Sequence, residues 1–243
     1  MGWVLGVLVL VLIGAVLRWI LRLDPSVTPQ GGERVPLGEE REAIYQPVAQ
    51  EIETQATILG ISLNDAFDER ASGNTEIAWR LVRLSASEWD RLAEILTLLA
   101  GAMAEQANDS RMLGPTPLLI ANRFKSQVMI DFVRTYELLG KVVLHSRIRL
   151  RLQLRMLRRA VEVLSQEFRR MYRYADRTED RPPELWTRLD LYFHDLDLIA
   201  KETLLVFQRL LLSLPHSSLP GFASSLAGIL RRGVRSASTT VNT

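Results

Sequence analysis

The chain has 243 residues, 47% of them hydrophobic and 24% charged, and its formal net charge at pH 7 is +2. It contains no cysteine, which excludes disulfide bonds, thiolate metal sites and lipid anchors attached through cysteine. The small net charge gives no overall electrostatic reason to bind nucleic acid, although nearly all of the basic residues are arginines.

An uninterrupted apolar segment opens the chain. Residues 1–17 carry no charged side chain, and Arg18 and Arg22 follow directly. A helix rises about 1.5 Å per residue and a bilayer core is about 30 Å thick, so about twenty residues span it. Residues 1–22 reach this length if the long stem of Arg18 extends toward the headgroups. No basic residue precedes the run and no small-residue cleavage site follows it, which favours an uncleaved transmembrane helix over a signal peptide. Without Arg18 the run is short, so a tilted or interfacial helix stays open.

The flanking arginines also predict how this anchor is oriented. Since the basic residues follow the apolar run, the positive-inside rule places the N-terminus outside and the main domain in the cytoplasm. Residues 23–38 are expected to form a linker, because three prolines and three glycines oppose both helix and central strand there. Such a tether would hold the following domain beside the membrane.

The apolar spacing of residues 39–214 predicts a bundle of helices. The expected helices, in chain order, are residues 39–59, 64–71, 75–84, 87–107, a long segment 118–174 with a break near residues 140–144, and 184–214. Pro47 is expected to kink the first of these or to start a new helix, Gly60 to weaken the helix before residue 64, and residues 72–74 to form a turn. Ser87, with Asp90 three positions later, has the pattern of a capping box, and Thr116 followed by a proline has that of an N-cap.

Two long apolar stripes indicate how the helices pack. The first has steps of four and three, typical of a heptad seam, and consists of Leu150, Leu154, Leu157, Val161, Leu164, Phe168 and Met171. A similar stripe follows in residues 184–214, and the two adjacent helices are expected to form an antiparallel hairpin. Trp79, Trp89 and Trp186 are expected to be core residues.

The segment 147–155 alternates arginine with apolar residues and also fits a half-buried strand. We favour a helix, because the segment lacks β-branched residues apart from Ile148 and no second strand exists to pair with it. The chain is expected to close with residues 215–243, which form a short amphipathic helix near residues 221–234 and a disordered tail from Ser236.

Positive charge concentrates in two of these helices. The candidate contact residues are Arg147, Arg149, Arg151, Arg155, Arg158, Arg159, Arg231 and Arg232. Three interpretations compete: a solvated face neutralised by neighbouring acids, contact with anionic lipid headgroups or a protein partner, and contact with nucleic acid. Nucleic acid ranks lowest, because no recognition motif accompanies the arginines.

Asp190, His194 and Asp197 are spaced to lie on one face of a helix and could bind a metal ion. A second helix would have to complete the ligand set, and the Glu-x-x-His spacing of di-iron bundles is missing. We therefore favour a solvated polar face, and we assign no catalytic, cofactor-binding or metal-binding residue.

The sequence thus predicts an all-α protein with one transmembrane helix, a flexible linker and a cytoplasmic helical bundle. The expected function is that of a non-enzymatic scaffold, adaptor or accessory subunit of a membrane-associated complex. Its expected partners are membrane lipid and a protein, or a second copy bound through helix packing. Two alternatives stay open: a membrane-tethered metal-dependent enzyme that uses Asp190, His194 and Asp197, and a sensor of anionic lipid surfaces.

Overall fold

The computed structural model describes residues 37–107, 121–142, 146–177 and 182–240. These residues are helical, with no strand among them, which confirms the all-α class. The elements are α2 (Glu39–Ala71), α3 (Thr75–Gln106), the 3-10 turn η1 (Ala121–Arg123), α4 (Gln127–Val142), α5 (Ser146–Asp176), α6 (Pro183–Ser213), the 3-10 turn η2 (His216–Ser218) and α7 (Leu219–Thr240).

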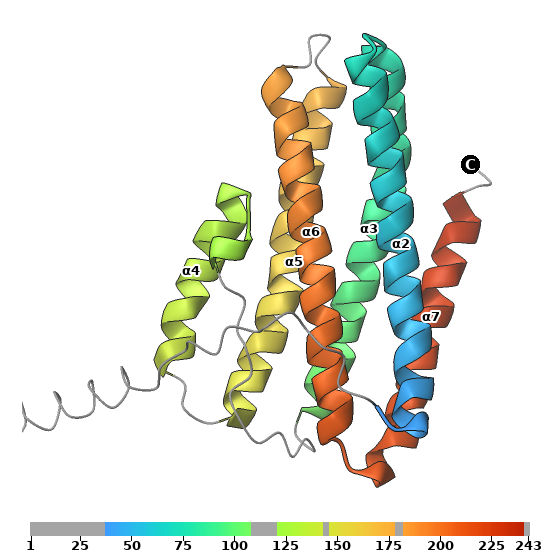
Figure 1. The fold of residues 1–243 in the computed structure, drawn as a ribbon, viewed down its shortest axis with the longest axis vertical. Coiled ribbons are helices and arrows are strands. Elements are labelled where there is room, and N and C mark those ends of the chain that lie inside the picture. The colour runs from blue at the N-terminus through green and yellow to red at the C-terminus, as the bar shows by residue number, and fades with distance from the viewer. Residues whose placement is uncertain (1–36, 108–120, 143–145, 178–181, 241–243) are drawn as a thin grey trace, which may run out of the picture. The chain divides into compact units, whose positions relative to one another are not determined.

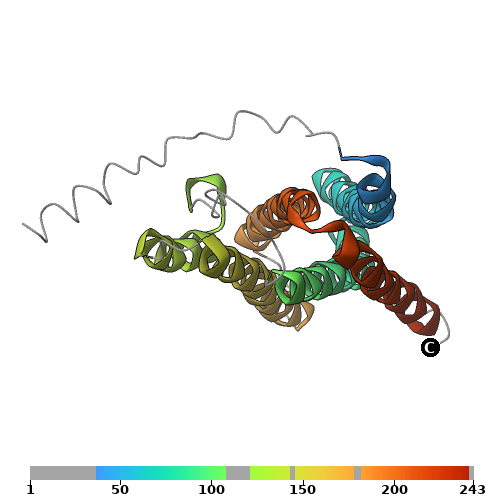
Figure 2. The same ribbon diagram turned by 90° about the horizontal axis from the view of Figure 1, so that it is seen from below.

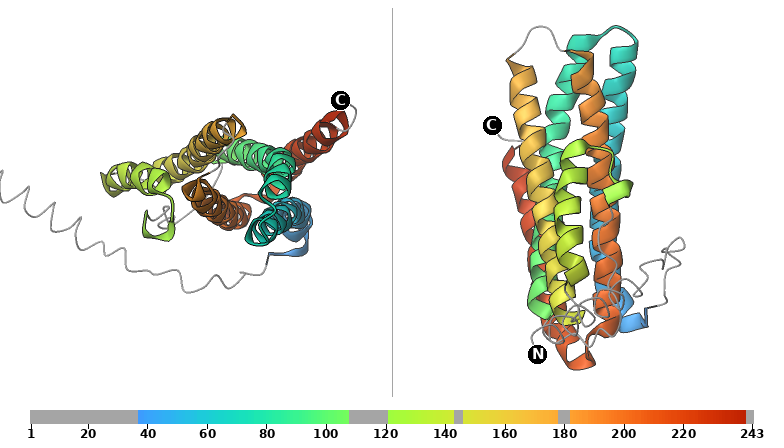
Figure 3. Two further views of the ribbon diagram at one scale, coloured as in Figure 1. Left: turned by 90° about the horizontal axis from the view of Figure 1, so that it is seen from above. Right: turned by 90° about the vertical axis from the view of Figure 1, so that its left-hand side faces the viewer.

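Four long helices form an up-down-up-down bundle: α2, α3, α5 and α6 (Figure 1). Helix α3 packs against both α2 and α5, and α6 packs against the same two helices from the other side. As a result, α2 and α5 lie at opposite corners of the bundle (Figure 2). Helix α4 packs on the outside of α5, whereas α7 packs on α3 and α2, so the two shorter helices flank the bundle on different sides (Figure 3).

The predicted anchor and all but the last two residues of the predicted linker lie outside the described residues, as does the predicted N-cap at Thr116. Within the part of the chain that the structure describes, no helix is both long and apolar enough to cross a membrane. The chain enters the bundle at α2, at the end where α5 begins and α6 ends (Figure 1).

A new helix start at Pro47 and a helix end at residue 59 are both wrong predictions, because tertiary packing overrides the local signals. Helix α2 runs without a break past Pro47 and Gly60, since Val48, Ile52 and Leu59 on its inner face are buried in the core. The turn expected at residues 72–74 is confirmed, and Gly73 supplies its positive φ of 85°.

Helix α3 is likewise continuous, so the predicted capping box does not start a helix. The hydroxyl of Ser87 donates to the carbonyl of Leu84 at 2.9 Å, which is the bond of a serine inside a helix. Trp79, Leu92 and Ile95 are buried on both sides of this point, and their shared burial holds the helix together.

The long helix predicted from residue 118 starts later, and the break predicted near residues 140–144 is confirmed. Its first part begins as α4 at Gln127. Helix α4 ends at Val142, and α5 begins at Ser146. Residues 147–155 belong to α5, so the preference for helix over strand is confirmed.

The predicted heptad seam of α5 is buried from Leu150, which is 1% exposed, to Met171, which is 8% exposed. Aromatic residues join the long helices of the bundle to one another. Trp89 on α3 stacks on Phe168 with ring centroids 4.2 Å apart, and Trp79 meets the ring of Trp186 at 6.1 Å. The three tryptophans expected in the core are therefore confirmed there.

The C-terminal helix, which was expected to lie outside the bundle of residues 39–214, is part of that bundle. Leu219, Phe222, Leu226 and Ile229 are buried in the same core as the four long helices, so α7 belongs to the bundle. Its backbone continues to Thr240, where the sequence predicted a disordered tail from Ser236. Arg41 on α2 binds the end of α6, where the chain turns toward α7. Its side chain donates to the carbonyl of Leu211 at 2.8 Å and to that of Leu214, the residue after the helix, at 3.1 Å.

Candidate functional site

Four of the predicted contact residues of α5 have exposed side chains. This helix carries nine arginines and three acidic residues, a net charge of +6, and none of the acids precedes Glu162. We define the basic face of α5 as its four exposed arginines in this region, Arg151, Arg155, Arg158 and Arg159. The side chains of Arg147 and Arg149, on the same helix, lie outside those that the structure describes.

Glu162 pairs with two of the four arginines of the basic face. Its carboxylate accepts hydrogen bonds from Arg159 Nη1 at 2.8 Å and from Arg158 Nε at 3.2 Å. The hydrogen bond from Arg159 is the largest cause that lowers the pKa of Glu162 below its ordinary value, with desolvation opposing it. Among the described residues, none forms an ion pair with Arg151 or Arg155, so no neighbouring carboxylate offsets the positive charge of these two exposed arginines.

Charge is separated across the bundle. Helix α2 carries eight acidic and two basic residues, a net charge of −6, which is equal and opposite to that of α5. Because α2 and α5 lie at opposite corners, the small net charge of the whole chain conceals an acidic side and a basic side (Figure 2).

The arginines of α7 do not extend the basic face of α5. Arg231 is exposed, and the side chain of Arg232 lies outside those that the structure describes. Since α3 lies between α7 and α5, the two helices that carry the predicted arginines are on separate sides of the bundle (Figure 3).

The three residues considered for a metal site do not form one. Asp197 accepts a hydrogen bond from Lys201 Nζ at 2.5 Å, His194 Nδ1 lies 3.2 Å from Asp195, and Asp190 is exposed. Within the described ranges, no group of three or more histidine and carboxylate side chains is arranged to hold a metal ion.

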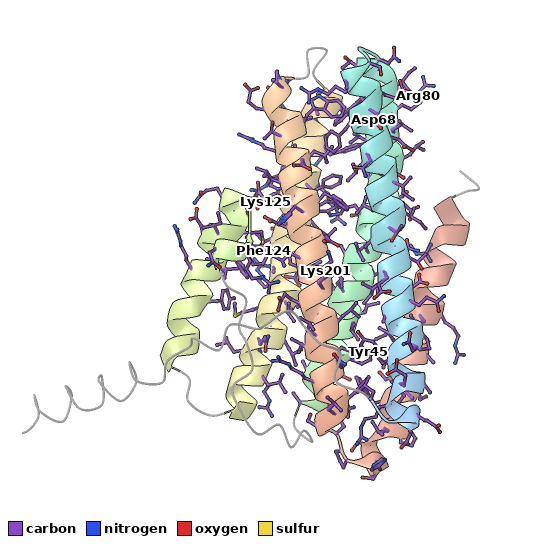
Figure 4. All side chains as sticks on the ribbon, viewed as in Figure 1. Tyr45, Asp68, Arg80, Phe124, Lys125 and Lys201 are labelled. Carbon is purple, nitrogen blue, oxygen red and sulfur yellow. The ribbon has the colours of Figure 1, made fainter. Side chains whose placement is uncertain are left out.

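Two buried carboxylates on α6 were missed by the sequence analysis. Asp195 is fully buried and accepts hydrogen bonds from the backbone amides of Lys125 at 2.8 Å and Ser126 at 2.9 Å, at the start of α4. About two turns further along the same face of α6, Glu202 is 4% exposed and pairs with Arg123 of η1. Asp195 thus holds the two backbone amides that precede α4, and Glu202 holds the Arg123 side chain, so both attach the start of α4 to the bundle, beside Phe124 and Lys125 in Figure 4. Their spacing in the sequence could have indicated this burial. Asp195 and Glu202 are seven residues apart, which places them on the same helix face as buried Ile199.

A groove lies between α2 and α6, with a volume of about 620 Å³; we call it the α2–α6 groove. Buried Ile52, Ala200 and Leu204 form its floor, and Ile61, which is 56% exposed, stands at its edge. Its charged lining residues are Glu53, Asp197 and Lys201, the last of which is labelled in Figure 4. The sequence gives no direct signal for this groove, because it arises where small residues of two distant helices face each other.

Comparison with protein-family models, with curated proteins and with solved structures gives no significant match. The basic face of α5 and the α2–α6 groove are the surface features that suggest a function for this chain.

Proposed function

We propose that this chain is a membrane-anchored helical scaffold whose bundle is oriented by its own charge. Residues 1–22 would anchor it, the basic face of α5 would lie against anionic lipid headgroups, and the opposite side would be presented to a protein partner. The observation that carries the proposal is the separation of charge between α2 and α5, at −6 and +6 on opposite corners of the bundle.

Physical considerations support this arrangement. A basic residue near an anionic leaflet contributes about 1 kcal/mol, and the acidic side of the bundle is repelled by the same surface. The chain enters the bundle at the end where α5 begins, so a tether at this point would bring the acid-free half of α5 toward the bilayer (Figure 1). Arg151 and Arg155 are available for this contact, since no described residue forms an ion pair with either.

Cell fractionation tests the anchor. The full-length chain is expected to stay in the membrane pellet through an alkaline carbonate wash, whereas a chain that lacks residues 1–22 is expected to be released. Release of the full-length chain by the same wash would contradict the anchor.

Native electrophoresis of mild detergent extracts tests the scaffold function. The chain is expected to migrate in a complex with a partner protein or with further copies of itself. A strictly monomeric chain, with nothing bound, would contradict this part of the proposal.

A second candidate function, reversible sensing of anionic lipid, is favoured by the same two arginines. It differs in one expectation: a sensor, whose residues 1–22 would not span the bilayer, leaves the membrane surface when the anionic lipid is removed. Salt-sensitive pelleting of the full-length chain with anionic vesicles alone, without a partner, would favour this function over the scaffold.

A further inference from the structure

The α2–α6 groove is open because the residues that face it from the two helices are small. Gly60 on α2 has no side chain, and the ring of Phe193 on α6 occupies part of that space, 3.1 Å from where a Cβ of residue 60 would lie. Ala56 and Ala200 line the same groove. Larger residues at these positions would fill the space between the helices, so the groove follows from the residue types themselves.

The length of the groove fits a helix. Its lining residues on α2 run from Ile52 to Asn64, a span of about 18 Å at the helical rise of about 1.5 Å per residue. This is about three turns, which matches the spacing of apolar anchors on an amphipathic helix that binds in a groove. Ile61 at the edge offers apolar surface beyond the floor, because more than half of it is exposed.

The charge around the groove selects for a basic occupant. Helix α2, which forms one wall, has a net charge of −6, and its Glu53 is among the residues that line the groove. On the α6 wall, Asp197 and Lys201 pair at 2.5 Å, so their charges balance each other. A helix with lysine or arginine beside its apolar stripe would therefore meet complementary charge, and one with acidic flanks would be repelled.

We propose that the α2–α6 groove binds an amphipathic helix of a partner protein that carries basic residues on both sides of its apolar stripe. The inference rests on the proposed scaffold function, because it assigns the surface through which the scaffold holds its partner. It does not depend on the basic face of α5, because no residue of α5 lines the groove.

The test uses designed peptides as probes. A labelled peptide of about fourteen residues carries a leucine stripe with lysine flanks, and a second peptide has the same stripe with glutamate flanks. Each is titrated by fluorescence anisotropy against the full-length protein in neutral-lipid nanodiscs, or in buffer if the chain does not insert. The lysine-flanked peptide is expected to bind at least about tenfold more tightly than the glutamate-flanked one.

A matched pair of variants locates the binding site. Ile61→Asp, at the edge of the groove, is expected to weaken the lysine-flanked peptide at least about tenfold. Ile58→Asp is the control, because Ile58 is 40% exposed on the same helix and does not line the groove. Ile58→Asp is expected to leave binding unchanged within about twofold, and circular dichroism shows whether both variants keep the helical fold.

Three results would overturn the inference: equal binding of the two peptides, equal effects of the two variants, or self-association that Ile61→Asp abolishes. The last result would assign the groove to a second copy of the chain. Failure of the anchor is read separately, from the carbonate wash, so it is not confused with failure of the groove.

Discussion

The ring of Phe193 on α6 lies against Gly60 on α2, with 3.1 Å between Phe193 Cζ and the position that a Cβ of residue 60 would take. Glycine in the middle of a helix costs about 1 kcal/mol relative to alanine. Here the missing side chain lets an aromatic ring from the facing helix approach α2, and it leaves the α2–α6 groove beside that ring.

Replacement of this glycine tests the close approach. Gly60→Ala gains helix propensity of about 1 kcal/mol, but its Cβ must push the ring of Phe193 aside by a few tenths of an ångström. We expect the two effects to offset, so that the free energy of unfolding changes by less than about 1 kcal/mol in chemical denaturation. In a Phe193→Leu background the obstacle is smaller, and the same substitution is expected to stabilise the protein. An equal gain in both backgrounds would show that the ring does not constrain residue 60.

The buried carboxylate of Asp195 is expected to hold α4 on the bundle. Asp195→Asn replaces one of two acceptor oxygens with an amide group that faces the backbone amides of Lys125 and Ser126. We expect a loss of about 1–3 kcal/mol in the free energy of unfolding, with faster hydrogen exchange at the start of α4.

The control for this experiment is Asp197→Asn on the same helix. Asp197 pairs with Lys201 at the surface, so its loss is expected to cost less than about 1 kcal/mol and to leave exchange in α4 unchanged. A similar cost for the two substitutions would contradict the role of Asp195.

Arg151 and Arg155 are expected to bind anionic lipid. The double substitution Arg151→Gln and Arg155→Gln removes two charges that no described residue pairs, and each is worth about 1 kcal/mol at an anionic surface. Native mass spectrometry of the full-length protein is expected to show at least about tenfold weaker retention of phosphatidylglycerol. The matched control replaces Arg188 and Arg209, two exposed arginines of α6, and is expected to have no such effect.

Replacement of Glu162 is expected to change lipid retention in the opposite direction. Glu162→Gln releases Arg158 and Arg159 from their shared carboxylate and is expected to strengthen retention of phosphatidylglycerol. The pKa of Glu162 is lowered in the folded protein, chiefly by the hydrogen bond from Arg159. Its stabilising contribution is therefore present above the ordinary carboxyl pKa and is lost as pH falls through the lowered value.

The variant is accordingly expected to be less stable than the natural chain at neutral pH, by less than about 1 kcal/mol. This difference is expected to vanish in acid, once Glu162 of the natural chain is protonated. Denaturation curves at several pH values check this expectation. A difference that does not change with pH would contradict the ion pairs as its source.

Much of the helical architecture could be predicted from the sequence, because apolar spacing reports directly on burial. The heptad seam of α5 lies in the core from Leu150 to Met171, and the alternating segment 147–155 is helical. Local breaking signals were less reliable. Gly60 and Ser87 both occur inside continuous helices, since the burial of residues on either side outweighs their local preferences.

The candidate sites depend on contacts between helices that are distant in the sequence, and the order of residues does not report these contacts. The arginines of α5 were identified, but their relation to the acidic α2 becomes visible only when the two helices occupy opposite corners. The α2–α6 groove is made by residues about 135 positions apart, and helical periodicity cannot report a space that two distant helices share. The same holds for Asp195, whose partners lie on another element.

The most direct test of the central claim is the orientation of the bundle at a membrane. The chain has no cysteine, so one introduced cysteine gives a single label: Gln166→Cys on the outer side of α5, or Gln50→Cys on the outer side of α2. A fluorophore at each position is measured for quenching by nitroxide-labelled headgroups, with the full-length protein in nanodiscs of anionic or neutral lipid. We predict stronger quenching on α5 than on α2 in anionic lipid, and loss of this difference in neutral lipid. Equal quenching at the two positions in anionic lipid would contradict the claim that charge orients the bundle.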